Sequence, residues 1–83
     1  MPFFVYALYS EKYDKIYVGF TSNLEGRLAS HNTLATKGWT IKFRPWSLIY
    51  SEQYGMKADA MRRERELKSA QGREFIRTLI KKK

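Results

Sequence analysis

Residues 3–20 have the sequence FFVYALYSEKYDKIYVGF, in which two apolar runs flank a polar one. The runs 3–9 and 16–20 are rich in β-branched and aromatic residues and are too short to be buried helices, so we predict a strand in each. The polar residues between them favour an antiparallel hairpin with a loop of medium length. The two predicted strands carry Tyr6 and Tyr17.

Local signals predict the structure of the next two segments. Ser22 and Glu25 have the spacing of a capping box, in which each side chain binds a free amide at a helix start. A helix is therefore expected to begin there and to end near Asn32. Residues 33–45 show no clean period and contain glycine and proline, which indicates a loop with a short extended piece at 39–43.

One more strand and two more helices complete the prediction. Residues 46–50 have strand composition, residues 57–70 are mostly strong helix formers, and a last helix is expected after Gly72. The predicted element order is therefore β-β-α-β-α-α. This order is typical of an α+β fold, an α/β protein in the broad sense, with a small three-stranded, mainly antiparallel sheet flanked by helices.

The composition is that of one small packed domain. A length of 83 residues, with 43% hydrophobic and 16% aromatic residues, fits a single core spanning residues 1–83. The chain has no cysteine, which excludes disulfides and zinc–thiolate clusters, and we expect a cytoplasmic protein. The apolar stretch 1–8 lacks a basic leader and is shorter than a membrane span, so we expect neither a signal peptide nor a membrane helix.

The net charge is strongly positive. Sixteen Lys and Arg residues against eight Asp and Glu residues give a formal charge of +8. A surface of this sign concentrates polyanions, so nucleic acid is the first partner to expect. Charge alone is equally compatible with a protein that is merely soluble and cationic.

One carboxylate lies on the apolar side of the second predicted helix. With Ala60 at 0° on a helical wheel, Leu67 falls at about 340° and Glu64 at about 40°, whereas Glu66 points away at about 240°. Burying an unpaired carboxylate is costly, so Glu64 is expected to pair with a cation, bind a metal or face a wet cleft. On periodicity alone, a surface ion pair with Lys68 at i+4 is the simpler explanation.

Taken singly, Tyr6, Tyr17, Arg27 and His31 have ordinary structural explanations, but they belong to a set of motifs in a fixed order. The set consists of Phe4-Val5-Tyr6, Tyr17-Val18-Gly19, Arg27, His31-Asn32, Thr40, Pro45-Trp46 and residues 60–68. It resembles the GIY-YIG endonuclease family, especially small stand-alone members related to the nuclease domain of the bacterial excision-repair protein UvrC. The resemblance covers nearly the whole chain. Phe4 replaces the opening glycine of the motif, and Val5 and Val18 replace its isoleucines.

The resemblance implies hydrolysis of a DNA phosphodiester. The implied catalytic residues are Tyr6, Tyr17, Arg27, His31 and Glu64, with Glu64 as the ligand of Mg²⁺ or Mn²⁺. This chemistry suits those residue types, because a phosphodiester gains negative charge as water attacks and a guanidinium with a divalent ion stabilises that charge. Either a tyrosine or His31 would help to deprotonate the water, and the choice between them is left open.

DNA binding is expected to come from basic and aromatic side chains outside that catalytic set. The basic residues assigned to it are Arg62, Arg63, Arg65 and Lys68. Trp39 or Trp46 is expected to stack on an exposed base. Nothing resembles a base-reading helix, so we expect recognition of DNA structure rather than sequence, in repair or recombination. The alternatives are a basic nucleic-acid-binding module on the same scaffold that does not cut, and an interaction domain for an acidic protein.

Overall fold

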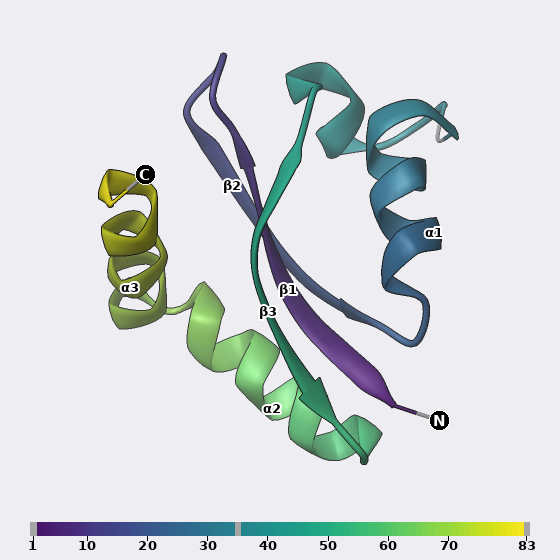
Figure 1. Ribbon diagram of the computed structural model, residues 1–83, viewed down its shortest axis with the longest axis vertical. Helices are drawn as coiled ribbons and strands as arrows, with labels where there is room; N and C mark the ends of the chain where they lie inside the picture. The colour runs from purple at the N-terminus through teal and green to yellow at the C-terminus, as the bar shows by residue number, and fades with distance from the viewer. Residues whose placement is uncertain (1, 35, 83) are drawn as a thin grey trace.

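The computed structural model describes residues 2–34 and 36–82 and shows an antiparallel sheet between two helical layers (Figure 1). The strands, in the spatial order β2-β1-β3, are β1 (Phe3–Ser10), β2 (Lys15–Thr21) and β3 (Ser47–Tyr54). The α-helices are α1 (Leu24–Ala29), α2 (Lys57–Lys68) and α3 (Ala70–Lys81). The predicted order β-β-α-β-α-α and the predicted α+β fold are confirmed.

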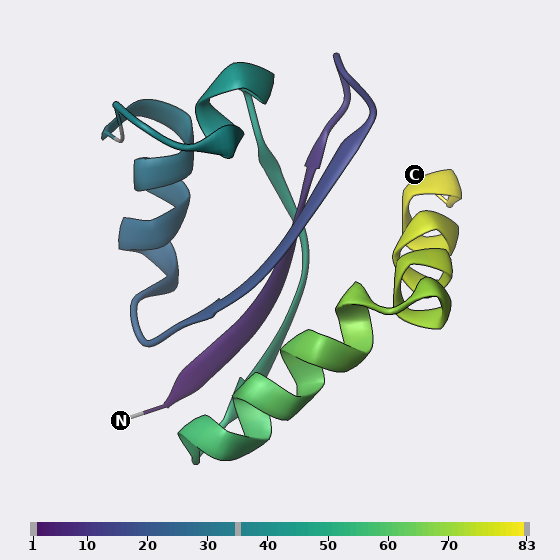
Figure 2. The same ribbon diagram turned by 180° about the vertical axis from the view of Figure 1, so that it is seen from behind.

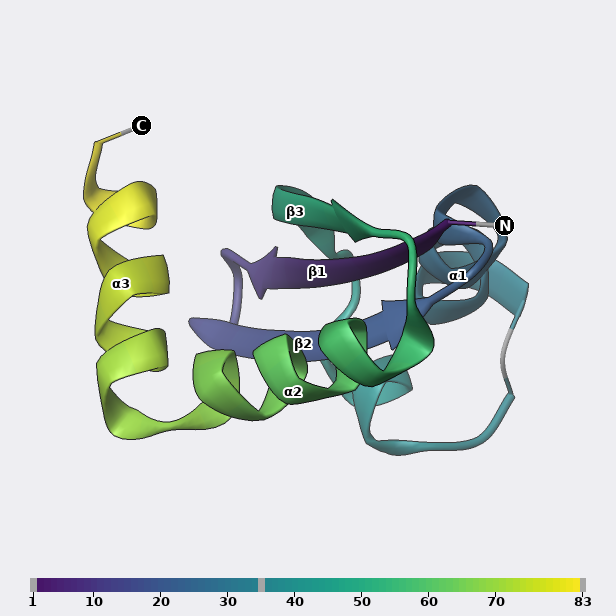
Figure 3. The ribbon, with the colours of Figure 1, turned by 90° about the horizontal axis from the view of Figure 1, so that it is seen from below.

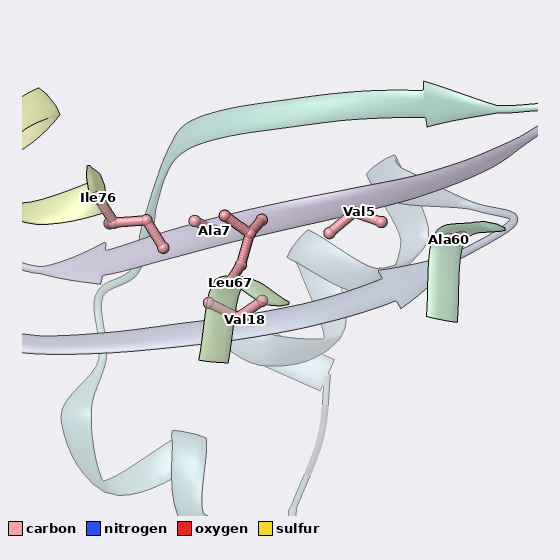
Figure 4. Close-up of a cluster of buried hydrophobic side chains, with 6 residues drawn as sticks. All are labelled: Val5, Ala7, Val18, Ala60, Leu67 and Ile76. Carbon is pink, nitrogen blue, oxygen red and sulfur yellow. The ribbon is translucent and has the colours of Figure 1, made fainter. Parts of the chain in front are cut away.

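Alternate side chains of β1 enter different helical layers, because successive residues of a strand point to opposite faces of the sheet. Helix α1 lies on one side of the sheet, and α2 and α3 lie on the other (Figure 1 and Figure 2). Val5 and Ala7 pack toward α2 and α3, in a cluster completed by Val18, Ala60, Leu67 and Ile76 (Figure 4). Tyr6 and Leu8 face the opposite layer and form a second cluster with Trp46. Both faces of the central strand are thus buried, as the apolar run 3–9 predicts.

Helix α1 begins one residue later than predicted, and the predicted capping box is wrong. Asn23 is the N-cap, and its side-chain oxygen accepts a hydrogen bond from the Gly26 amide at 3.1 Å. The Thr21 hydroxyl accepts a hydrogen bond from the Asn23 amide at 3.0 Å, which places Asn23 rather than Ser22 at the helix start. The helix continues past Asn32 as a π-helical turn, η1 (Ser30–Leu34).

The structure corrects two further local predictions. Residues 39–43 form a 3₁₀ helix, η2 (Trp39–Phe43), rather than an extended piece, because Thr40 turns inward while the rings of Trp39 and Phe43 pack together at 4.7 Å. Helix α3 begins before Gly72, since the Ser69 side chain caps it by accepting from the Gly72 amide at 3.2 Å. Along the described part of the chain, every helix is too short or too polar to cross a membrane.

Glu52 on β3 holds α2 against the sheet. Its carboxylate accepts hydrogen bonds from Arg63 Nε at 3.0 and 3.1 Å and from the hydroxyls of Tyr50 and Tyr54. Burial would raise the pKa of Glu52, but these hydrogen bonds outweigh it and hold that pKa below its ordinary value. The contact restricts rotation of α2 about its own axis, and it therefore sets the direction of the next residue, Glu64.

Candidate active site

Tyr6 lies across the sheet from Gly19, its register partner on β2. A Cβ atom on Gly19 would lie 2.8 Å from the Tyr6 hydroxyl oxygen and 3.1 Å from a ring carbon of Tyr17. Only glycine therefore leaves room for both tyrosines. The Tyr6 side chain is buried, and its burial, followed by the neighbouring Tyr17, raises the pKa of Tyr6 well above its ordinary value. Tyr6 is therefore a neutral phenol near pH 7.

His31 joins Tyr6 to η2. Its Nε2 atom lies 3.1 Å from the Tyr6 hydroxyl, and its Nδ1 atom lies 3.0 Å from the Thr40 hydroxyl. Burial, then the charges of Arg27 and Arg44, lowers the pKa of His31 below its ordinary value, so the ring is neutral near pH 7. A neutral imidazole has one N–H and one lone pair, and a hydroxyl matches each of them.

Tyr17 completes an aromatic cluster with Tyr6 and His31. Its ring centroid lies 4.7 Å from that of His31 and 6.2 Å from that of Tyr6. Tyr6 and His31 are buried, whereas Tyr17 is half-buried and reaches the surface. The fold thus brings together three of the residues that were predicted to be catalytic, from two strands and the turn after α1.

Hydrogen bonds among residues in and around η2 fix the position of His31. The Asn32 side chain binds both backbone groups of Trp46, donating to its carbonyl at 2.9 Å and accepting from its amide at 2.6 Å. The Trp46 indole donates to the Thr40 carbonyl at 2.8 Å, and Arg44 Nε donates to the His31 carbonyl at 2.6 Å. Asn32 and Thr40 appeared in the motif set without a role, and no periodicity signal could have assigned them this one.

The two tryptophans differ sharply in exposure. Trp46 is 3% exposed and belongs to the core, so of the two tryptophans expected to stack on a base it is the one that cannot. Trp39 is 47% exposed, although its ring also packs on that of Trp46 at 5.9 Å. Of the two, only Trp39 is accessible to a ligand.

Replacing Thr40 by valine is expected to destabilise the protein by about 1–3 kcal/mol, because a buried ring nitrogen of His31 then loses its hydrogen-bond partner. Thr40→Ser keeps the hydroxyl and is expected to lose less than about 1 kcal/mol. Urea unfolding monitored by circular dichroism measures both variants. Equal stability of Thr40→Val and the wild type would show that the Thr40 hydroxyl does not hold His31.

Glu64 occupies the position on α2 that the helical wheel indicates. Ala60 and Leu67 are fully buried, and Glu64 lies beside them with its side chain 19% exposed. Lys68 Nζ lies 3.5 Å from one of its carboxylate oxygens, so the ion pair expected at i+4 is present. The carboxylate is therefore partly buried, paired with a cation and still open to water.

Arg27 and Glu64 act on the tyrosine cluster from opposite sides of the sheet. Arg27 is exposed on α1, and Glu64 lies on α2, which packs below β2 (Figure 3). Both charges influence the pKa of Tyr6, which Arg27 lowers and Glu64 raises. Because β2 is an edge strand, groups from the two layers can approach each other around its open edge.

A cleft of about 250 Å³ follows this open edge of β2. It is lined by Ile16, Tyr17, Val18, Trp39, Lys68 and Arg73. Tyr17 belongs to both the cleft and the aromatic cluster, and Lys68 pairs with Glu64. We call it the β2-edge cleft. The aromatic cluster thus meets this cleft at Tyr17, and Glu64 is connected to it through its ion pair with Lys68.

Residues 2–77 match the model of the GIY-YIG catalytic domain. The chain belongs to the GIY-YIG family. A UPF0213 protein of Staphylococcus haemolyticus is 41% identical to it over 58 residues, which are 70% of this chain and 71% of that protein. A UPF0213 protein of Staphylococcus aureus is 32% identical over 68 residues, or 82% of each chain. The solution NMR structure of a UPF0213 protein from Bacillus halodurans superposes with a TM-score of 0.57 at 27% identity, over 95% of this chain and 85% of that one.

The GIY-YIG match confirms the resemblance seen in the ordered motifs. All residues predicted to be catalytic lie inside the matched region, which ends at residue 77. The matched domain is a nuclease domain, so the chain carries the fold of a nuclease. The names of its UPF0213 relatives state no activity.

GIY-YIG nucleases generally use divalent metal ions, and the residues of this site fit one kind of ion. Within the described residues, no group of three or more His, Asp or Glu side chains is placed to hold a metal. That excludes a structural zinc site there, which takes four protein ligands. Glu64, a single carboxylate open to water, suits an ion such as Mg²⁺ that keeps several waters and binds a substrate phosphate.

The cations predicted to bind DNA in this GIY-YIG domain have different neighbours. Arg63 lies between the carboxylates of Glu52 and Glu66, at 3.0 and 3.3 Å. Arg62 pairs with Asp59 at 3.0 Å but keeps 71% of its side chain exposed, and Arg65 is also exposed. The contacts of Arg63 are structural, and its DNA contact stays a prediction.

Proposed function

We propose that this GIY-YIG protein is a divalent-metal-dependent DNA endonuclease that hydrolyses phosphodiester bonds and recognises DNA structure rather than sequence, in repair or recombination. One observation carries the proposal. Tyr6, Tyr17 and His31 form one cluster, and the charges of Arg27 and Glu64 both act on its central hydroxyl. Tyr6, Tyr17, Arg27 and His31 all lie 33 or more positions from Glu64 in the sequence, yet the Glu64 charge affects the pKa of Tyr6, the central residue of the cluster.

Each charged residue has a distinct part in the proposed reaction. The Arg27 guanidinium binds a phosphate oxygen and stabilises the negative charge that develops as water attacks. Glu64 would hold the divalent ion, which would supply Lewis-acid stabilisation of the developing charge. The Lys68 ammonium lies 3.5 Å from the Glu64 carboxylate and forms an ion pair with it.

One residue of the cluster, Tyr17, faces the substrate. The other two, Tyr6 and His31, hold the Tyr17 ring in position. Both ring nitrogens of His31 are engaged by hydroxyls, and the raised pKa of Tyr6 makes it a hydrogen-bonding phenol rather than a base. Tyr17 lines the cleft, so we assign the attacking water to it: its hydroxyl orients the water, and only its phenolate form can accept the water's proton. Tyr6 and His31 restrict the position of the Tyr17 ring by packing against it.

A second candidate function is a basic module that binds nucleic acid without cutting it. The Glu64–Lys68 ion pair favours this alternative, because Lys68 occupies part of the space beside the carboxylate that a metal ion needs. The formal charge of +8 suits both functions equally.

Cleavage of a panel of labelled DNAs tests the proposal. Duplex, forked, flapped and single-stranded DNAs are incubated with the protein in Mg²⁺, in Mn²⁺ and in EDTA, and products are separated on a denaturing gel. We expect cleavage with a divalent ion and none in EDTA. Arg27→Ala is expected to lower kcat/KM about 10²-fold, the usual effect of removing one group that stabilises the transition state.

Arg77→Ala is the matched control for Arg27→Ala. Arg77 is an arginine on α3 that pairs with Asp14, and it lies outside the aromatic cluster. We expect this variant to cleave within about twofold of the wild type. Salt-sensitive DNA binding with no cleavage under either ion would reject the nuclease and favour the binding module.

A further inference from the structure

The β2-edge cleft is lined partly by side chains that have no part in the catalytic roles proposed for Tyr17 and Glu64. Its lining combines the exposed indole of Trp39, the β2 residues Ile16, Tyr17 and Val18, and the cations Lys68 and Arg73. No carboxylate is among the side chains that line it. An aromatic face, apolar side chains and two cations suit a ligand that has both a flat ring and an anionic group.

The Trp39 ring is restrained by packing against two other aromatic rings. Its ring packs against Phe43 at 4.7 Å and against the buried Trp46 at 5.9 Å, while 47% of the residue stays exposed. An indole that is held on one side and open on the other loses little side-chain freedom when a ring stacks on it. Stacking of a base on such a side chain is worth about 1–3 kcal/mol and does not depend on the sequence.

The two cations lie together at the junction of α2 and α3. Arg73 Nε donates to the Lys68 backbone carbonyl at 3.4 Å, so the guanidinium is tied to the C-terminal end of α2. The Lys68 side chain is 49% exposed and also reaches Glu64. A phosphate bound by these cations therefore lies beside the carboxylate of the proposed catalytic site.

We propose that the β2-edge cleft binds one unpaired nucleotide of a DNA strand, with its base stacked on Trp39 and its phosphate held by Arg73 and Lys68. The next phosphodiester then lies beside Tyr17. The inference rests on the proposed function only in taking DNA as the ligand. It specifies the substrate class, which is DNA with a single-stranded segment next to the cleaved bond.

The size of the cleft argues against an intact duplex as the occupant. About 250 Å³ is less than the roughly 300–1,000 Å³ of clefts that enclose drug-sized ligands, and it suits a single base. In a duplex both faces of an internal base are covered by its neighbours. Only an unpaired or terminal base has a face free to stack on Trp39.

Binding to a fluorescein-labelled dT₁₂ oligonucleotide and to a blunt 12-base-pair duplex, in EDTA, tests the inference. Trp39→Ala is expected to weaken single-strand binding by roughly 5- to 150-fold, the equivalent of the stacking energy, and duplex binding by less than about twofold. Trp39→Phe keeps an aromatic face and is expected to retain most of the affinity. Single-strand binding should also quench the tryptophan fluorescence of the wild type, and this quenching should be absent in Trp39→Phe, whose remaining indole is buried.

Arg73→Ala gives a second test that leaves the Trp39 packing untouched. It is expected to reduce the slope of log K against log salt for the single strand by about 1, whereas Arg77→Ala leaves that slope unchanged. Unchanged single-strand affinity in Trp39→Ala, or equal losses for single strand and duplex, would overturn the inference. The binding assay needs no metal and no cleavage, so a protein that never cuts DNA can still pass it, and an active nuclease can still fail it.

Discussion

Replacing Glu64 by glutamine is expected to lower kcat/KM for DNA cleavage about 10³-fold, equivalent to about 4 kcal/mol in the activation barrier, without loss of folding. Glutamine keeps the size of the side chain but removes the charge that a divalent ion requires. The cost in stability should be small, because the main structural interaction lost is the i,i+4 ion pair with Lys68, worth a few tenths of a kcal/mol.

Glu66→Gln is the matched control for this experiment. Glu66 lies two residues further along α2, is 57% exposed at its side chain and pairs with Arg63 rather than with Lys68, which lines the cleft. We expect it to cleave within about threefold of the wild type. Single-turnover rates on the best substrate of the panel, with circular dichroism to verify folding, measure both variants. Full activity in Glu64→Gln would remove Glu64 from the site and with it the proposed metal ligand.

Replacing Gly72 by alanine is expected to destabilise the protein by about 3 kcal/mol and to lower Tm by about 12–24 °C. A Cβ atom at residue 72 would lie 2.3 Å from the Glu66 carbonyl oxygen and 2.4 Å from the Leu67 Cα atom. These are backbone atoms that no side-chain rotation can move, so α3 must shift away from α2. That shift would also loosen Ile76, which packs with Leu67 in the core.

Gly55→Ala tests whether this loss comes from the close approach of the two helices. Gly55 precedes α2, and a Cβ atom added there would meet no atom within 4 Å. We expect its stability to be unchanged or slightly raised, because alanine restricts the unfolded chain. Thermal unfolding of both variants measures the difference. Similar Tm values for Gly72→Ala and Gly55→Ala would show that the α2–α3 junction tolerates a side chain.

The same junction connects stability with the proposed function. Lys68 ends α2 and Arg73 lies in the first turn of α3, and both line the β2-edge cleft. The close approach at Gly72 therefore sets the spacing between the two cations. We expect a variant that keeps the sheet but moves α3 to lose single-strand affinity before it loses the aromatic cluster around His31.

Local sequence patterns are enough to predict the elements and one feature of the site. Composition predicts the strands at 3–9 and 16–20, because β-branched and aromatic residues favour the pleated backbone whatever lies around them. Helical periodicity alone places Glu64 beside Ala60 and Leu67, since the period of an α-helix is a property of its backbone. The motif order then suffices to predict the family, which the match over residues 2–77 confirms.

Only the tertiary structure decides which side chains meet. The Tyr6–His31 hydrogen bond joins residues 25 positions apart, and the Glu52–Arg63 contact joins residues 11 apart. In neither pair does the local sequence of one residue indicate its partner. The distance within each pair depends on tertiary features such as sheet register and the path of η2. For the same reason, composition cannot distinguish the buried Trp46 from the exposed Trp39. The sequence by itself determined the order of the main strands and helices and placed Glu64 on the apolar side of its helix, because backbone geometry repeats over a few residues. The aromatic cluster and the β2-edge cleft come from packing of segments far apart along the chain, which no local period encodes.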